Sequence, residues 1–177
     1  MKYIEYLLFT KNYVDAADWC IKITLDSQNW EEKILIFAKE GRLEDIYDKI
    51  PSSNPTLTPA IYEKVLNEFL RLKNYKILKY LINKWPCDIY DLKCITNAVL
   101  DAQQIDKSQI LLQTLAILYE YQKLFDKSFV IYIGLSDQTV FEFLVKHNLY
   151  KCAFENIISL IALNRKVRKN KIDFLTN

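Results

Sequence analysis

The sequence contains little glycine and little histidine. Among 177 residues only Gly41 and Gly134 are glycines, although an average content of ~7% would supply roughly a dozen. Gly-rich loops that cradle phosphates or dinucleotides therefore cannot be built, which excludes Walker-type and Rossmann-type nucleotide binding. The single histidine, His147, excludes multi-histidine metal sites and leaves nucleophilic catalysis one candidate base. These absences favour a scaffold over an enzyme.

Neither an excess of one charge nor a long apolar run is present. The 24 Lys and Arg residues against 22 Asp and Glu residues give a formal net charge of +2, too small for the strong positive field of phosphate-backbone binding, so we expect no nucleic-acid partner. No apolar run reaches the ~18 residues that cross a bilayer, and Glu5 interrupts the apolar region that a signal peptide needs. We expect a cytoplasmic chain with at most a peripheral membrane contact.

The four cysteines show no spacing typical of a metal site or a disulfide framework. Cys20, Cys87, Cys94 and Cys152 include no Cys-x-x-Cys pair and stand in no secretory context, so we expect reduced thiols in the core. Cys87 and Cys94 could share a helix face, but a zinc site needs further ligands that are not nearby. We therefore predict no metal and no cofactor.

Apolar residues recur at helical spacing almost everywhere. The composition, 51% hydrophobic and 26% charged, is that of a soluble globular protein, and few stretches alternate like a half-buried strand. Each stripe is the buried face of an amphipathic helix. The stripes are Tyr13-Ala16-Ala17-Cys20-Ile23, Tyr62-Val65-Leu66-Phe69, Leu78-Leu81-Ile82-Trp85, Leu111-Thr114-Leu115-Leu118 and Ser128-Ile131-Tyr132-Leu135.

Capping residues and prolines indicate where helices begin and end. Asn29, Asp106 and Thr58 are the predicted caps, and Pro59 follows the last of them. Pro86 ends the helix before it. A cluster of prolines between residues 51 and 59 cannot continue a helix. We therefore predict a single segment over 1–177 with blocks 1–50 and 59–165, a Pro-rich loop at 51–58 and a basic tail at 166–177.

A short phrase recurs, in which an aromatic or apolar residue is followed three residues later by a smaller or apolar one. The copies are Tyr13-x-x-Ala16, Leu43-x-x-Ile46, Tyr75-x-x-Leu78, Phe125-x-x-Ser128 and Tyr150-x-x-Ala153. In helix-turn-helix repeats such a residue opens the second helix of a pair and docks between neighbouring helices. We predict an all-α, right-handed α-solenoid of degenerate TPR-like repeats with roughly nine or ten helices. A single helical bundle with coincidental aromatics is the alternative.

No group of residues points to catalysis. A helix that ends at His147 would place Asn148 in the left-handed capping conformation, and we prefer this structural role for the histidine. The carboxylate pairs Asp15/Asp18, Glu31/Glu32 and Glu44/Asp45 are interpreted as solvated helix faces, because general acid–base chemistry needs a desolvated cleft. We therefore predict no catalytic residue.

The end of the chain is the candidate partner surface. Its last apolar helix presents Phe154, Ile157, Ile158 and Ile161 on one side, followed by the basic residues Arg165, Lys166, Arg168, Lys169 and Lys171. An exposed apolar face promotes association, and the basic run favours an acidic partner. A solvated helix extension is the alternative for the basic run.

Several stretches in order cover most of residues 13–161 and carry a family resemblance. They are Ala17-x-Trp19-Cys20-x-Lys22-Ile23, Pro55-x-Leu57-x-Pro59-x-Ile61-Tyr62-Glu63, Glu68-Phe69-Leu70, Trp85-Pro86-x-Asp88-Ile89-Tyr90, Leu111-Leu-x-x-Leu115-Ala116-x-Leu-Tyr119, Phe125-x-x-x-Phe129-x-Ile131-Tyr132-x-x-Leu135, Val140-Phe141 and Lys146-His147-Asn148-Leu149-Tyr150. Together these stretches resemble the clathrin-heavy-chain-repeat region of the vacuolar protein sorting 41 family.

The resemblance implies a non-enzymatic subunit of the homotypic fusion and vacuole protein sorting (HOPS) tether, which holds late endosomes and vesicles at the vacuole or lysosome before fusion. Other HOPS subunits are the expected partners, and self-association is a further possibility. No β-propeller and no RING-type ending accompany the repeats, so we expect a fragment or a reduced family member. A clathrin-type coat element or generic TPR module would share the fold, whereas a helical-repeat RNA binder would need a basic groove.

Overall fold

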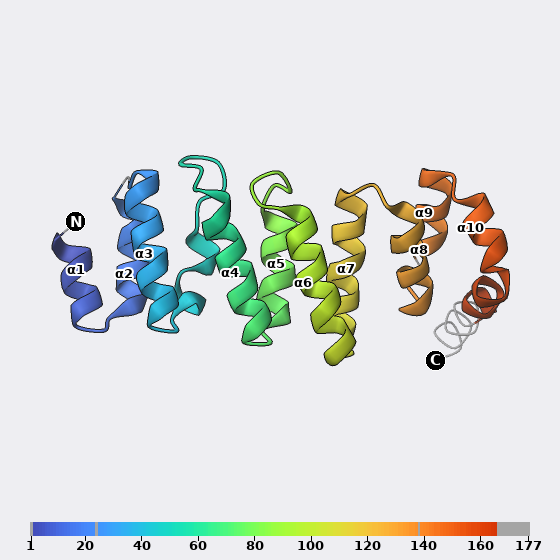
Figure 1. Ribbon diagram of the computed structural model, residues 1–177, viewed down its shortest axis with the longest axis horizontal. Coiled ribbons are helices and arrows are strands. Elements are labelled where there is room, and N and C mark those ends of the chain that lie inside the picture. The colour runs from blue at the N-terminus through green and yellow to red at the C-terminus, as the bar shows by residue number, and fades with distance from the viewer. Residues whose placement is uncertain (1, 24, 138, 166–177) are drawn as a thin grey trace, which may run out of the picture. The chain divides into compact units, whose positions relative to one another are not determined.

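The computed structural model describes residues 2–23, 25–137 and 139–165, and every regular element in this part is a helix (Figure 1). Residues 157–165 are also helical. The predicted all-α, TPR-like fold is confirmed. The elements are α1 (Lys2–Phe9), α2 (Tyr13–Lys22), α3 (Ser27–Lys39), the 3₁₀ helices η1 (Leu43–Asp45) and η2 (Tyr47–Lys49), α4 (Pro59–Arg71), α5 (Tyr75–Lys84), α6 (Leu92–Ile105), α7 (Gln109–Tyr121), α8 (Phe125–Gly134), α9 (Val140–His147) and α10 (Tyr150–Glu155).

The helices form two compact units, Met1–Ala102 and Gln103–Asn177. In the first unit α1 packs on α2, α3 on α4, and α4 on α5; in the second, α7 packs on α8, α8 on α9, and α9 on α10. Residues 51–58 are free of helix, and the Tyr62 hydroxyl donates to the carbonyl of Pro51 at 2.9 Å. The predicted blocks 1–50 and 59–165 stay a prediction about domain organisation.

Three of the five apolar stripes are buried in full. Those of α4, α5 and α7 have exposed fractions of 3% or less at every position, Trp85 included. The α2 stripe is buried at Ala16, Ala17 and Cys20 and half-buried at its two ends. The α8 stripe is only half-buried beyond Ser128, while Phe129, which the stripe omitted, is fully buried. The predicted helical period is therefore right. In α8, however, the buried face is shifted by about one residue from the predicted stripe.

The five repeated phrases all begin a helix, because the same turn precedes each of them. Two residues before each phrase the backbone is left-handed, with φ between 55° and 67°. The left-handed residue donates its backbone N–H to the carbonyl oxygen three residues earlier. The residue after it donates its N–H to the carbonyl oxygen five residues earlier. The N–O distances of these bonds are 2.8–3.3 Å. This is the Schellman pattern of helix ends. The left-handed residues are Lys11, Gly41, Lys73, Lys123 and Asn148.

The first residue of each phrase was predicted to dock between neighbouring helices. It does so in the first four copies but not in the last. Leu43 and Tyr75 are buried, and Tyr13 and Phe125 are half-buried. Tyr150 is 59% exposed, so its predicted docking between helices is wrong. Within the described part of the chain no later helix pair packs on α10 to cover this ring.

The predicted helix starts are right at one position and displaced at two. Thr58 is the cap of α4 and Pro59 its first residue, as predicted. The cap of α3 is Asp26, whose carboxylate accepts the N–H of Asn29 at 2.8 Å, so Asn29 lies inside the helix. The helix α7 begins after Ser108 rather than Asp106. Both errors arise because several polar residues precede each helix, and periodicity does not decide which of them caps it.

Glutamates on α3 and α4 connect successive repeats of the first unit. Glu31, the fifth residue of α3, accepts the backbone N–H of Thr58 at 2.7 Å, just before α4. Glu63, the fifth residue of α4, accepts the N–H of Asp91 at 2.9 Å, just before α6. An ionised acceptor makes such a hydrogen bond strong. In both cases a glutamate at the fifth position of one helix accepts the backbone N–H just before a later helix, α4 in the first case and α6 in the second.

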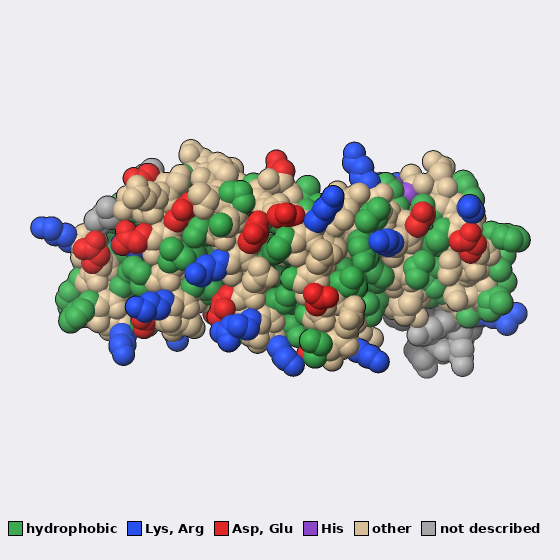
Figure 2. Space-filling view, in the orientation of Figure 1, with side chains coloured by type: hydrophobic (Ala, Val, Ile, Leu, Met, Phe, Trp, Pro, Cys, Tyr) green, Lys and Arg blue, Asp and Glu red, His purple; other side chains and the backbone are tan. Residues whose placement is uncertain are grey.

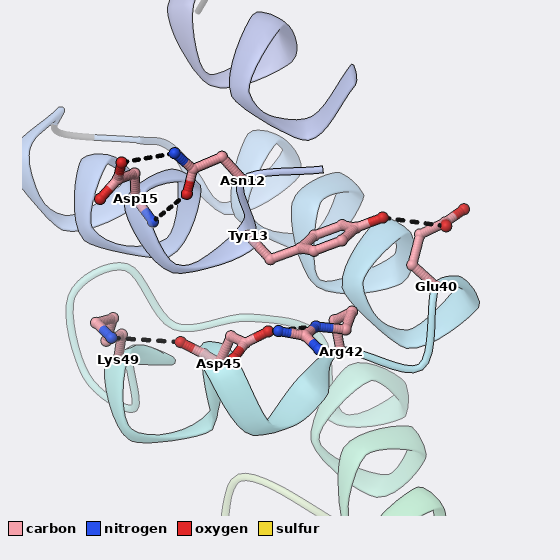
Figure 3. Close-up of polar contacts among 7 residues, drawn as sticks. All are labelled: Asn12, Tyr13, Asp15, Glu40, Arg42, Asp45 and Lys49. Carbon is pink, nitrogen blue, oxygen red and sulfur yellow. Dashed lines mark hydrogen bonds and ion pairs between the residues drawn. The ribbon is translucent and has the colours of Figure 1, made fainter. Parts of the chain in front are cut away.

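Polar contacts also join the first two turns (Figure 3). The Tyr13 hydroxyl donates to Glu40 Oε2 at 3.2 Å, and Arg42 lies over the Tyr13 ring at 5.3 Å. Arg42 Nε in turn donates to Asp45 Oδ2 at 2.6 Å. Tyr13, the first residue of α2, thereby positions the turn that follows α3.

Candidate protein-interaction surface

The predicted apolar face at the end of the chain is exposed. Phe154 in α10 is 76% exposed, and the three isoleucines of the following helical residues 157–165 are also exposed. Ile157 and Ile161 are about half-exposed (47% and 48%), and Ile158 is 82% exposed. Figure 2 shows hydrophobic side chains projecting at this end of the second unit. We call Phe154, Ile157, Ile158 and Ile161 the C-terminal face.

The opposite side of the same helices forms the core of the second unit. Leu160 and Leu163 alternate with the exposed isoleucines and are buried. They pack in one cluster with Phe129, Val140, Leu149 and Cys152. The helix 157–165 is therefore apolar on two sides, and only one side has a partner among the described residues.

Equivalent positions in earlier repeats show why the C-terminal face is unusual. Counted from the left-handed residue of each turn, Ile157 occupies the position that Cys20, Ile50 and Ile82 occupy in earlier repeats, where the exposed fraction is 2% or less. The α8 residue at this position, Tyr132, is half-buried. The position is therefore one that the repeat normally covers, and at Ile157 no described residue covers it.

The basic part of the candidate surface lies mostly outside the described residues. Arg165 is exposed at the end of the helical stretch. Lys166, Arg168, Lys169 and Lys171 lie outside the described residues, so their part in the surface stays a prediction. So does the assignment of the C-terminal face to a partner.

His147 ends α9 as predicted, and Asn148 caps the helix in the left-handed conformation with φ 55° and ψ 40°. The imidazole of His147 stacks on Phe125 at a centroid distance of 3.9 Å and lies 4.5 Å from Phe143. Nε2 is buried and has no hydrogen-bond partner among the described residues. The ring is thus part of the aromatic packing of α8 and α9.

The carboxylates interpreted as solvated faces are exposed or half-buried, and they also accept hydrogen bonds or ion pairs. Asp15 accepts from the Asn12 amide at 2.7 Å, Asp18 pairs with Lys49 at 3.2 Å, and Glu44 accepts from Asn74 at 2.7 Å. Glu32 pairs with the buried Lys33 at 3.1 Å. Sequence periodicity placed these residues on polar faces but could not identify partners about 30 residues away. In the described ranges no three His, Cys, Asp or Glu side chains are close enough to hold a metal ion.

The cysteines are unpaired, but they are not all core residues. Cys20 and Cys152 are buried, whereas Cys87 is half-buried and Cys94 exposed, which corrects the prediction for the second pair. Cys87 precedes α6 and Cys94 lies in its first turn, so the two do not share a helix face. Burial raises the pKa of the Cys20 thiol to about 11, with nearby Lys33 opposing the shift.

Tyr132 donates a short hydrogen bond to Glu120. Burial raises the pKa of the Tyr132 hydroxyl well above its ordinary value, and the Glu120 carboxylate raises it further. Burial likewise raises the pKa of the Cys152 thiol. None of these raised-pKa groups is a ready nucleophile near neutral pH, because the ionised form is the reactive one.

These features define a class of protein. Paired helices follow one another through the same left-handed turn, the described residues form no strand, and an apolar face is exposed at one end. This is the architecture of a helical-repeat protein, in which each repeat packs on its neighbours and the outer surfaces remain available. The described part of the chain contains no helix that is both long and apolar enough to cross a bilayer.

The chain belongs to the Vps41 TPR-like region family, whose model matches residues 1–176. It is 36% identical over 163 residues to the vacuolar protein sorting-associated protein 41 homolog of Homo sapiens, covering 91% of this chain and 19% of that protein. The corresponding protein of Schizosaccharomyces pombe is 30% identical over 167 residues, covering 93% of this chain and 19% of that protein. The chain thus spans about a fifth of the length of these relatives. No solved structure matches it.

Proposed function

We propose that this chain is a non-enzymatic interaction segment of a HOPS-like vesicle-tethering complex, which acts in transport from late endosomes and vesicles to the vacuole or lysosome. Its relatives are named for vacuolar protein sorting. Its expected location is the cytoplasm, peripherally associated with late endosomal and vacuolar or lysosomal membranes. Other tether subunits are its expected partners, and self-association is a second possible contact of the same surface.

The observation that carries the proposal is the exposed C-terminal face. Burying Phe154, Ile157, Ile158 and Ile161 against a partner would remove apolar side chains from water, at ~25 cal/mol for each Å² buried. Large exposed apolar patches on soluble proteins mark interaction sites. The basic residue Arg165 at its edge favours an acidic partner surface and a salt-sensitive association rate.

Affinity capture of the tagged chain from its own cells, followed by mass spectrometry, tests the proposal. The expected result is that several other tether subunits are recovered with the tagged chain. Capture of coat components without tether subunits, or of RNA-binding proteins that nuclease treatment removes, would contradict it. The capture is repeated at high salt, because a contact through an apolar face survives screening better than one through surface charges alone.

A further inference from the structure

A groove between α3 and α4 belongs to the first unit, whereas the C-terminal face belongs to the second. It has a volume of about 490 Å³ and is lined by Leu35, Ala38 and Lys39 of α3 and by Lys64 and Glu68 of α4. Figure 2 shows Lys and Arg side chains gathered over the lower part of this unit, where α3 and α4 end, while Asp and Glu lie mainly in its upper part. The groove therefore lies between two helices, and its charged lining residues are two lysines and one glutamate.

The floor of the groove is apolar and open. Leu35 is 39% exposed, although the apolar residues beside it in the helix, Ile34 and Phe37, are fully buried. Ala38 lies one turn further along the same side of α3. A small residue beside an exposed leucine leaves room for an incoming apolar side chain, as in other grooves that receive peptide anchors.

The charged lining of the groove is positive on balance. The carboxylate of Glu68 accepts from Arg71 Nη2 at 2.6 Å and from Arg71 Nε at 2.9 Å. This pairing, with a smaller effect of Lys64, holds the pKa of Glu68 below its ordinary value. Lys39 makes no ion pair with any described residue. Because Arg71 already engages Glu68, Lys39 and Lys64 are the charges that a ligand would meet.

The groove recurs at the equivalent place in the second unit, which indicates that the repeat builds it. There residues of α7 and α9, together with Tyr132 of α8, line a groove of about 350 Å³. Counted from the left-handed turn residues, its lining residues Glu120, Thr139 and Phe143 match Ala38, Lys64 and Glu68 of the first groove. The charge differs, since the second groove carries Glu120 and Glu142 against the single lysine Lys146, whereas the first carries two lysines against Glu68. The two grooves therefore favour ligands of different charge.

We propose that the α3–α4 groove binds an acidic amphipathic peptide segment of a partner protein. An apolar side chain of the segment lies on Leu35 and Ala38, and its carboxylates pair with Lys39 and Lys64. This pairing of an apolar anchor with opposite charges gives both affinity and orientation. The site is separate from the C-terminal face, so it adds a second contact to the proposed function and does not depend on it.

A binding titration with the purified full chain tests this site. The probe is a short fluorescein-labelled helical peptide with leucines on one face and glutamates on the other, and its counterpart carries lysines in place of the glutamates. We expect the parent chain to prefer the glutamate peptide. The double substitution Lys39→Glu and Lys64→Glu should weaken that binding by about tenfold or more and transfer the preference to the lysine peptide.

Lys93→Glu with Lys107→Glu is the matched control, because both lysines are exposed and lie elsewhere. It should leave the preference unchanged. Three results would overturn the proposal. The control could lose binding equally, or the parent could show no preference between the two peptides. The chain could also bind phosphatidylserine vesicles instead of the peptide, with Lys39 and Lys64 responsible for that binding. Circular dichroism of each variant separates lost binding from lost folding.

Discussion

At the scale of single residues, the turn positions have the most specific requirement. Gly41 has φ +67°, and a Cβ built there would meet no atom within 4 Å. The cost of Gly41→Ala is therefore the left-handed backbone alone, about 1 kcal/mol of unfolding free energy. Lys11→Gly, at an equivalent turn with φ 59°, should change stability in the opposite direction, by about 0.5 kcal/mol. Urea denaturation measures both; a stabilising Gly41→Ala would contradict the strain assigned to this turn.

The buried thiol of Cys20 makes a second prediction. Its pKa is raised from 9.0 to about 11 in the folded chain, so the folded state holds its proton at a pH where the unfolded state loses it. Stability from this group is complete below pH 9 and is lost as the pH rises toward 11. At pH 8 iodoacetamide should label Cys94 and leave Cys20 unmodified, as measured by mass spectrometry. Labelling in urea is the control, and rapid labelling of native Cys20 would contradict its burial.

At the scale of the elements, burial distinguishes two aromatic residues that look alike in the sequence. Phe129 lies fully buried in the core of the second unit, whereas Tyr150 is largely exposed at the start of α10. Phe129→Ala should therefore cost about 3–5 kcal/mol of unfolding free energy because it leaves a cavity. Tyr150→Ala should change it by about 0.5 kcal/mol or less. Similar melting of both variants would show that α8 is oriented differently.

The two glutamates that accept backbone N–H groups just before later helices make a further prediction. Glu31→Ala and Glu63→Ala each leave a backbone N–H without its charged acceptor, and each should cost about 1–2 kcal/mol. Glu5→Ala, at an exposed position of α1, is the control and should be nearly neutral. Thermal unfolding provides the comparison. If the three variants unfold alike, the two contacts contribute nothing to stability.

At the scale of the whole molecule, the sequence predicts what is local and repeated. The spacing of Tyr62, Val65, Leu66 and Phe69 indicated a buried helix face, and Asn148 indicated a left-handed helix end; both are confirmed. Lysines in the other left-handed turns gave no such signal, because lysine is uncommon there. The α3–α4 groove was missed for another reason. Leu35 and Lys64 lie on helices far apart in the sequence, and only the packing of those helices brings them together.

The capture experiment with substitutions in the C-terminal face tests the central claim most directly. Ile157→Asp together with Ile158→Asp places two charges where a partner would bury apolar surface. The control is Ile105→Asp, because Ile105 at the end of α6 is 86% exposed and Ile158 is 82% exposed. We predict that the double variant keeps its helical circular dichroism spectrum but no longer recovers tether subunits, while the control recovers them like the parent. Undiminished recovery by the folded double variant would contradict the assignment of this face to a partner.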